Sequence, residues 1–163
     1  MKTVYLALGA NLGERERNLA QALDALETEG VHIVRRSSLY ETEPRDVRDQ
    51  PWFLNLVVET ETSLLPRQLL STIRRIEKNL GRRRVVAKGP RTIDVDILLF
   101  GRFVVDTPEL QIPHPRMTAR RFVLEPLAEL APELRHPITR RTVREMLAEV
   151  MDQQVRRVLT SPQ

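Results

Sequence analysis

The sequence contains no cysteine, few aromatic residues and no long hydrophobic run. Without cysteine the chain has neither disulfide bonds nor thiolate ligands for a metal, which fits a protein of the cytosol. Its longest apolar runs, such as VDILLF, are far shorter than the ~20 residues that a membrane-spanning helix needs. We therefore expect a cytoplasmic protein that does not associate with membranes.

Lysine is also scarce, since the only lysines are Lys2, Lys78 and Lys88, and arginine supplies the rest of the positive charge. The net charge is +4. The many arginines have two possible causes, a genome rich in G and C or an anionic partner such as nucleic acid or a phosphorylated small molecule. The 163 residues are 41% hydrophobic and 29% charged, which predicts one globular domain over residues 1–163.

The periodicity of apolar residues predicts an α+β domain of ferredoxin-like type, an antiparallel sheet with flanking helices. The predicted strands are residues 3–10, 31–42, 52–62 and 91–101. The predicted helices are residues 14–30 and 66–81, followed by two shorter ones near 120–132 and 142–151. We interpret His32 as structural and His136 as part of a surface turn.

Two aspartates, Asp94 and Asp96, interrupt the apolar strand IDVDILLF. Because strand side chains alternate, both carboxylates point to one face, with their Cα atoms ~7 Å apart. Magnesium suits such a pair, because it takes oxygen ligands and shares its shell with phosphates and water. The opposite face, with Ile93, Val95 and Ile97, is expected to pack on helices and hold the carboxylates in place.

A pair of strand aspartates is also typical of a solvated sheet face, so its surroundings decide between the two interpretations. The arginines of GRRR and GPR lie just before the strand and favour a site for phosphoryl transfer. The sequence GANLGE lacks the lysine of a P-loop, which argues against that class of enzyme. His114 is fixed between two prolines in IPHPRM and suits a hydrogen bond to phosphate.

Several blocks along the chain resemble the 6-hydroxymethyl-7,8-dihydropterin pyrophosphokinase family of folate biosynthesis. They are LALGANLG, YETEP, DQPWFLNLVVE, GRRR, GPRTIDVDILLFG, IPHPRM and RRFVLEPLAELAPEL. The resemblance implies transfer of pyrophosphate from the co-substrate ATP to the hydroxymethyl group of the pterin, with release of AMP. It implies two Mg²⁺ ions as cofactors. It also implies a monomer that binds small-molecule substrates and no nucleic acid. It identifies no general base.

The resemblance also implies roles for individual residues. The metal ligands are Asp94 and Asp96, which act in catalysis together with Arg82 and Arg91. The ATP-binding residues are Arg82, Arg84, Arg91, His114 and Arg120. The pterin-binding residues are Phe53 and Phe122, which stack on the ring, Asn55, which hydrogen-bonds its polar edge, and the backbone near Thr42 and Pro44.

The sequence departs from the family at two places. Lys88 stands where many members have tryptophan, and Thr118 and Ala119 replace a His-Glu pair.

Two other functions are also possible. The basic charge and the order of elements allow a nucleic-acid-binding module, although the strands lack a pair of exposed aromatics. Paired strand aspartates are used by metal-dependent nucleotidyltransferases and nucleases as well. Formation of AMP that requires a pterin would separate these functions.

Overall fold

The structure is a computed structural model that describes residues 1–43, 52–81 and 93–158. Its strands are β1 (Lys2–Ala10), β2 (Val31–Arg36), β3 (Tyr40–Thr42), β4 (Phe53–Thr62), β5 (Asp94–Phe100), β6 (Val105–Asp106), β7 (Gln111–Ile112) and β8 (Arg156–Arg157). Its helices are α1 (Arg15–Thr28), α2 (Pro66–Asn79), the 3₁₀ turn η1 (Met117–Ala119), α3 (Arg121–Leu130) and α4 (Val143–Ala148). No helix in this part of the chain is long and apolar enough to cross a membrane.

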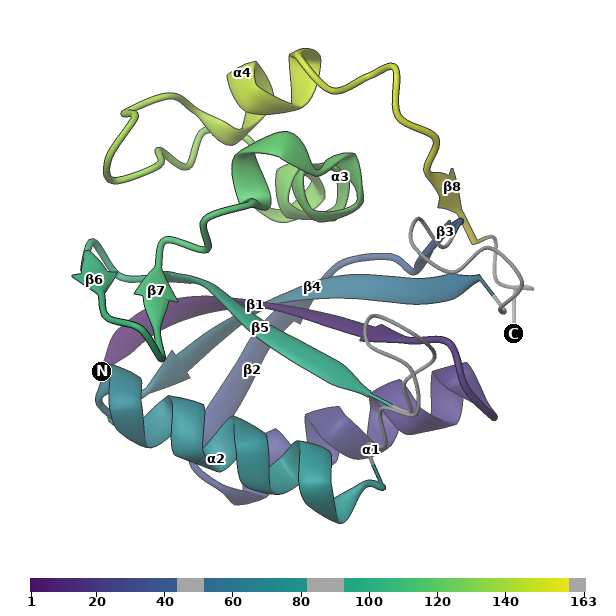
Figure 1. Cartoon of the computed structure of the whole chain (residues 1–163), viewed down its shortest axis with the longest axis vertical. Coiled ribbons are helices and arrows are strands. Elements are labelled where there is room, and N and C mark those ends of the chain that lie inside the picture. Colours follow the sequence, from purple (N-terminus) through teal and green to yellow (C-terminus); the bar gives the residue numbers. More distant parts are fainter. Residues whose placement is uncertain (44–51, 82–92, 159–163) are drawn as a thin grey trace.

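Six of the described strands form one sheet in the order β5-β1-β4-β3-β8, and β2 also pairs with β4 (Figure 1). All of these pairings are antiparallel. β1 pairs with β4 along its whole length, from Lys2 opposite Thr62 to Ala10 opposite Leu54. The arrangement confirms the predicted ferredoxin-like α+β fold, with an antiparallel core and flanking helices.

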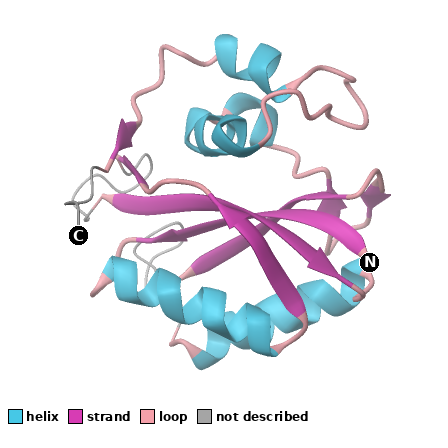
Figure 2. Cartoon of the chain, turned by 180° about the vertical axis from the view of Figure 1, so that it is seen from behind, coloured by secondary structure: helices cyan, strands magenta, loops and turns pink. Residues whose placement is uncertain are grey.

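Helices cover both faces of the sheet and bury two separate hydrophobic cores. Figures 1 and 2 show α1 and α2 on one face and α3 and α4 on the other. Even-numbered residues of β1, such as Leu6 and Leu8, pack in the core under α1 and α2. Tyr5 packs in the second core with Leu124 and Leu127 of α3. This alternation assigns each strand residue to one face, and burial of these side chains supplies most of the stability.

The ends of α2 follow directly from its sequence. Pro66 occupies the first helical turn, where its missing N–H has no partner to lose. Gly81 follows the helix with φ of 79°, the left-handed conformation that glycine adopts at low cost. The exact end matters for the site, because Glu77 in the last turn of α2 contacts β5.

One predicted strand is wrong in its extent. The segment 31–42 forms two strands, β2 and β3, and the residues between them, 37–39, leave the regular ladder. The side chain of Ser37 accepts a hydrogen bond from the Val57 N–H at 2.9 Å. Glu129 of α3 accepts one from the Ser38 N–H at 2.9 Å. These polar contacts replace ladder bonds at residues 37–39. The weak alternation of the sequence did not reveal this break between the two strands.

Candidate active site

Asp94 and Asp96 lie on β5 and face the α3 side of the sheet. Both are partly exposed, whereas Val95 between them is buried. Ile93, Val95 and Ile97 belong to the core under α1 and α2, which confirms the predicted packing of that face. The sequence pattern therefore places two carboxylates on a rigid strand whose other face is anchored in a core.

Contacts on both edges of β5 hold the strand in place. On one edge β5 pairs with β1, with Asp94 opposite Gly9 and Asp96 opposite Ala7. On the other edge, the Val95 N–H donates to Oε2 of Glu77 at 2.9 Å. The His114 N–H donates to the Leu98 carbonyl oxygen at 2.9 Å. An edge strand is thus fixed by a buried carboxylate and a proline-rich segment, and its two aspartates gain defined positions.

A row of three residues crosses the centre of the sheet on the same face. The strand register places Asn55 of β4 opposite Gly9 of β1, and Gly9 opposite Asp94 of β5. Neighbouring strands lie ~4.8 Å apart, so Asn55 and Asp94 are separated by ~10 Å. Gly9 has no side chain, and Ala7 in the next row is small. No large side chain of β1 therefore stands between Asn55 and the two aspartates.

Gly9 is required by its contact with Asn55. A Cβ atom at residue 9 would lie 2.8 Å from Oδ1 of Asn55 and 3.8 Å from the ring of Phe53. The first distance is shorter than any ordinary Cβ contact, so a larger residue would displace the amide. Glycine inside a strand is often a place of close approach, and this is the one signal by which the sequence could have identified Gly9 as part of the site.

The side chain of Asn55 is buried and held in one orientation. Its Nδ2 donates to Oγ1 of Thr42 at 2.9 Å, and both residues are only 8% exposed. Within the described residues, no donor reaches Oδ1 of Asn55. Buried polar atoms are nearly always paired in folded proteins, so this oxygen has a hydrogen-bonding capacity that a ligand can use.

Aromatic side chains lie at both sequence-predicted positions. Phe53 is at the start of β4, on the same face as Asn55, and is partly buried. Phe122 is the second residue of α3, and the Arg120 guanidinium lies over its ring, 5.4 Å from the centroid. The two rings thus come from different elements, the first from the sheet and the second from α3.

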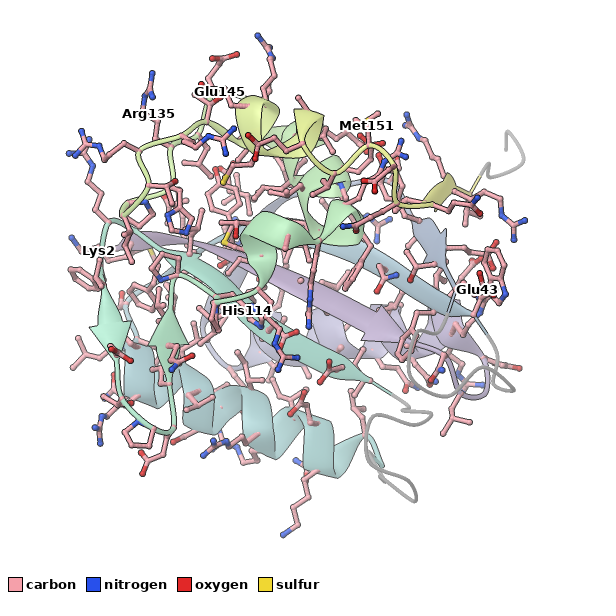
Figure 3. All side chains as sticks on the ribbon, turned by 45° about the horizontal axis from the view of Figure 1, so that its top comes forward. Lys2, Glu43, His114, Arg135, Glu145 and Met151 are labelled. Atoms are coloured by element: carbon pink, nitrogen blue, oxygen red, sulfur yellow. The ribbon has the colours of Figure 1, made fainter. Side chains whose placement is uncertain are left out.

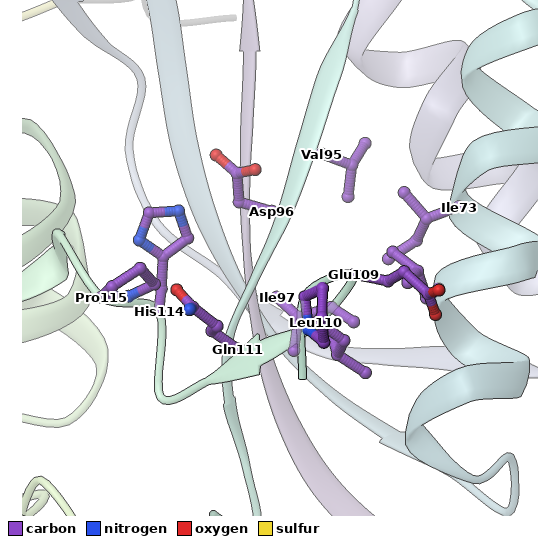
Figure 4. Close-up of a pocket in the computed structure, with 11 residues that line it drawn as sticks. Ile73, Val95, Asp96, Ile97, Glu109, Leu110, Gln111, His114 and Pro115 are labelled. Carbon is purple, nitrogen blue, oxygen red and sulfur yellow. The ribbon is translucent and has the colours of Figure 1, made fainter. Parts of the chain in front are cut away.

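His114 shares a hollow with Asp96. The hollow has a volume of about 280 Å³, and its lining also includes Leu70 of α2 and Gln111 of β7. Figure 4 shows His114 and Asp96 on one side of β5 and Val95 with Ile73 on the other. Figure 3 shows His114 between the sheet and the start of α3.

The protonation of His114 follows from its surroundings. Burial, followed by the charges of Arg120 and Arg116, lowers the pKa of His114 to about 4, against the opposing influence of Asp94. The Arg116 N–H donates to Nδ1 at 3.1 Å. The ring is therefore neutral at pH 7 and carries its hydrogen on Nε2, which makes it a hydrogen-bond donor.

The donor set at β5 fits a metal ion that completes its shell elsewhere. Among residues 1–43, 52–81 and 93–158, no group of three or more histidine, aspartate or glutamate side chains is close enough to hold an ion. Asp94 and Asp96 supply two carboxylates on one face. This matches magnesium, which is commonly bound through one or two carboxylates together with phosphate oxygens and water.

Some sequence predictions fall on residues that the structure does not describe, and one is wrong. Arg82, Arg84, Arg91, Pro44 and Lys88 lie outside the described residues. His136 does lie in a turn, but the prediction that it is a surface residue is wrong, because it is only 6% exposed. Its Nδ1 accepts hydrogen bonds from the N–H groups of Ile138 and Thr139, both at 3.2 Å. His32 is exposed on β2, with Nδ1 3.3 Å from Glu27.

The fold and the site together define an α+β domain with two carboxylates on one face of its edge strand and a buried amide two strands away on the same face. The family described as 7,8-dihydro-6-hydroxymethylpterin-pyrophosphokinase (HPPK) matches residues 5–132. The chain belongs to this family. The match confirms the resemblance inferred from the sequence blocks.

Relatives of two kinds match the chain. The 2-amino-4-hydroxy-6-hydroxymethyldihydropteridine pyrophosphokinase of Bacillus subtilis is 48% identical over 136 residues, which are 83% of this chain and 81% of that protein. The folic acid synthesis protein fol1 of Pneumocystis carinii is 40% identical over 158 residues. That match covers 97% of this chain but only 21% of the Pneumocystis protein, so the chain spans about a fifth of this longer relative.

A solved structure shares the fold. The Plasmodium falciparum HPPK-DHPS structure with pteroate has a TM-score of 0.76 and 18% sequence identity. The similarity covers 93% of this chain and 44% of the Plasmodium chain. At this identity the comparison supports the architecture, and the roles of individual residues depend on the geometry described above.

Proposed function

We propose that this chain transfers pyrophosphate from ATP to the hydroxymethyl group of 6-hydroxymethyl-7,8-dihydropterin, giving AMP and the pterin diphosphate. The observation that carries the proposal is the row of Asn55, Gly9 and Asp94 across three strands. A polar group for a flat heterocycle and a carboxylate pair for metal-bound phosphates lie ~10 Å apart on the α3 side of the sheet. Membership of the pyrophosphokinase family supports ATP and the pterin as the two substrates of this site.

Asn55 and the two phenylalanines are proposed to bind the pterin. Asn55 Oδ1 accepts from the polar edge of the ring, while Thr42 keeps the amide from rotating. Phe53 and Phe122 stack on opposite faces, because aromatic pairs stabilise a flat ring by offset contact. Gly9 allows the ring to lie close to the sheet, with its hydroxymethyl group directed toward β5.

The charged residues are proposed to bind ATP. Asp94 and Asp96 would hold the two Mg²⁺ ions that the family resemblance implies, and these ions would neutralise phosphate charge. His114 donates from Nε2 to a phosphate oxygen, and Arg120 adds a positive charge. We extend this proposal to Arg82, Arg84 and Arg91, which the family resemblance assigns to the phosphates. The chain contributes position and charge, which is most of what phosphoryl transfer requires.

The direct test is an assay with ATP, Mg²⁺ and hydroxymethyldihydropterin, followed by chromatography of the nucleotides. We expect AMP to form only when the pterin is present. Asp96→Asn removes a charged ligand and should lower kcat/KM at least 100-fold, equivalent to about 3 kcal/mol of barrier. Asp106→Asn, at an exposed position of β6, is the matched control and should retain full activity. A folded Asp96→Asn protein with normal turnover would contradict the metal-binding role.

Nucleic-acid binding, the first rival function, has little support from the structure. Sheets that bind single strands stack bases on exposed aromatics of an open face. Here α1 and α2 cover one face and α3 and α4 pack on the other (Figure 2). A nucleotidyltransferase releases pyrophosphate rather than AMP from ATP, and neither it nor a nuclease requires the pterin, so the same assay would separate the second rival from the proposed function. The cytoplasmic location and the monomeric state stay predictions.

A further inference from the structure

The segment 151–158 crosses from α4 to the opposite side of the site. Figure 1 shows the chain leaving α4 and reaching β8 beside β3, and Figure 3 shows Met151 at the α4 end of this path. The family match ends at residue 132, so the segment lies beyond the part of the chain that the family defines. Its contacts fall on two places, the start of α3 and the strand β3.

The first place is the start of α3, which carries Arg120 and Phe122. Gln153 Oε1 accepts a hydrogen bond from the Arg121 N–H at 3.0 Å, and Gln153 Nε2 donates to the Ala119 carbonyl oxygen at 2.7 Å. The Arg121 guanidinium donates in turn to the Gln153 carbonyl oxygen at 2.7 Å. Gln153 thus binds the backbone on both sides of Arg120.

The second place is the strand that carries Thr42. β8 pairs with β3, with Arg156 opposite Glu41. Arg156 Nη2 donates to Oε1 of Glu41 at 2.9 Å, and its guanidinium stacks over the Trp52 ring, 4.7 Å from the centroid. Glu41 precedes Thr42, and Trp52 precedes Phe53. Arg156 therefore holds together Glu41 and Trp52, the residues next to Thr42 and Phe53.

A second arginine strengthens the same contact. Arg15, at the start of α1, donates to Oε2 of Glu41 at 2.9 Å and to the Trp52 carbonyl oxygen at 3.0 Å. Arg15 and then Arg156 lower the pKa of the Glu41 carboxyl below its usual value. Glu41 is therefore ionised at neutral pH, and both of its oxygens are bound by arginine.

We infer that the segment 151–158 positions both walls of the pterin pocket, through Gln153 at Phe122 and through Arg156 at Thr42 and Phe53. The inference rests on the proposed function, because it takes these residues as the pterin contacts. β3 has only three residues, and without β8 it would be a short edge strand held by its pairing with β4 alone. Its pairing with β8 and the Arg156 contacts fix Thr42, which in turn fixes Asn55. Gln153 and Arg156 are positioning residues that do not touch the substrate.

The test compares steady-state kinetics of Arg156→Ala and Gln153→Ala in the full chain. The matched control is Arg144→Ala, which breaks an exposed arginine–glutamate pair, Arg144–Glu133 at 2.7 Å, on α4. We expect Arg156→Ala to raise the KM for the pterin about fivefold and to leave the KM for ATP and kcat within twofold. Gln153→Ala should raise the KM for both substrates, because Arg120 lies between its two backbone contacts. Arg144→Ala should change none of these values.

Arg156→Lys and Trp52→Leu probe the same contact from its two sides, and they replace Arg156→Ala if that variant does not fold. The lysine retains a charge for Glu41, so it should give a KM for the pterin between those of the wild type and the alanine variant. Equal rises in the KM for ATP and pterin with Arg156→Ala, or values matching Arg144→Ala, would overturn the inference. The wild-type assay separates the two proposals: if the wild type makes no AMP with the pterin, the proposed function fails. An active wild type with unchanged variants contradicts only the positioning role.

Discussion

Gly9 lies at the centre of the site, between the residues proposed to bind the pterin and the two carboxylates. Its neighbours in the strand register are Asn55 on one side and Asp94 on the other. A Cβ atom here would lie 2.8 Å from Asn55 Oδ1, and in the proposed arrangement it would lie between the two substrates. Gly9 has no side chain, and it therefore leaves space between Asn55 and the two aspartates.

We predict that Gly9→Ala weakens pterin binding by about 1–2 kcal/mol, because the displaced amide of Asn55 loses its alignment. Binding of an ATP analogue, measured by calorimetry on the same protein, should change little. Gly30→Ala is the control: residue 30 has φ of 89° and open space around its Cβ position, so this change strains the backbone far from the site. It should lower the melting temperature without affecting either ligand. Unaltered pterin affinity in Gly9→Ala would show that Asn55 adapts freely.

His136 is a residue whose burial the sequence did not reveal. Burial lowers the pKa of its imidazole. Because the folded state resists protonation while the unfolded chain protonates near pH 6.5, stability is complete above that pH and declines as the pH falls below it. The neutral ring also uses Nδ1 to accept two backbone N–H groups, a role that the protonated ring loses.

We predict that His136→Asn makes the protein less sensitive to acid. The Oδ1 of asparagine can take the place of Nδ1 as acceptor, and asparagine does not titrate. Urea unfolding at pH 7.5 and pH 5.5 should show a smaller loss of stability in the variant than in the wild type. The difference is at most ~1.4 kcal/mol for each pH unit below 6.5. Equal losses in both proteins would exclude His136 as the responsible group.

At the scale of elements, β5 shows how far sequence patterns determine the site. The alternation of Asp94, Val95 and Asp96 predicted which side chains face the core, because alternation is a local property of any strand. The roles of Gly9 and Ala7 depend on the register of β1 against two other strands, which no local pattern encodes. The break between β2 and β3 likewise depends on Glu129, which comes from α3, far along the chain.

Glu77 links α2 to β5, and we predict that this link contributes to stability. Glu77→Ala leaves the buried N–H of Val95 without its acceptor and should cost about 1–3 kcal/mol of unfolding free energy. Glu77→Gln retains an oxygen acceptor and should cost less than the alanine variant. Glu16→Ala, at an exposed position of α1, serves as the control in the same urea titrations. A Glu77→Ala protein as stable as this control would mean that β5 is held by its other contacts alone.

At the scale of the whole molecule, the two cores lie on opposite faces of the sheet and hold different parts of the candidate site. The core under α1 and α2 fixes the backs of β1, β4 and β5, so that Asn55, Gly9 and Asp94 share a rigid face. On the other side, Phe122 of α3 packs at the margin of the second core, and the Arg120 guanidinium lies over its ring. The helical tail was predicted as two short helices, but its return to β3 through β8 depends on contacts between distant residues, so sequence periodicity could not reveal it.

The central claim is that pterin and metal-bound ATP meet over Gly9, between Asn55 and the two aspartates. The most direct measurement is paramagnetic relaxation of the pterin hydroxymethyl protons in a complex with Mn²⁺ and a non-hydrolysable ATP analogue. Two strand spacings separate β4 from β5, so the account predicts a metal–proton distance of ~10 Å or less. The enhancement should disappear when Asp94 and Asp96 are both replaced by asparagine while the pterin stays bound. A distance beyond ~20 Å, or an enhancement unchanged in the double variant, would contradict the account.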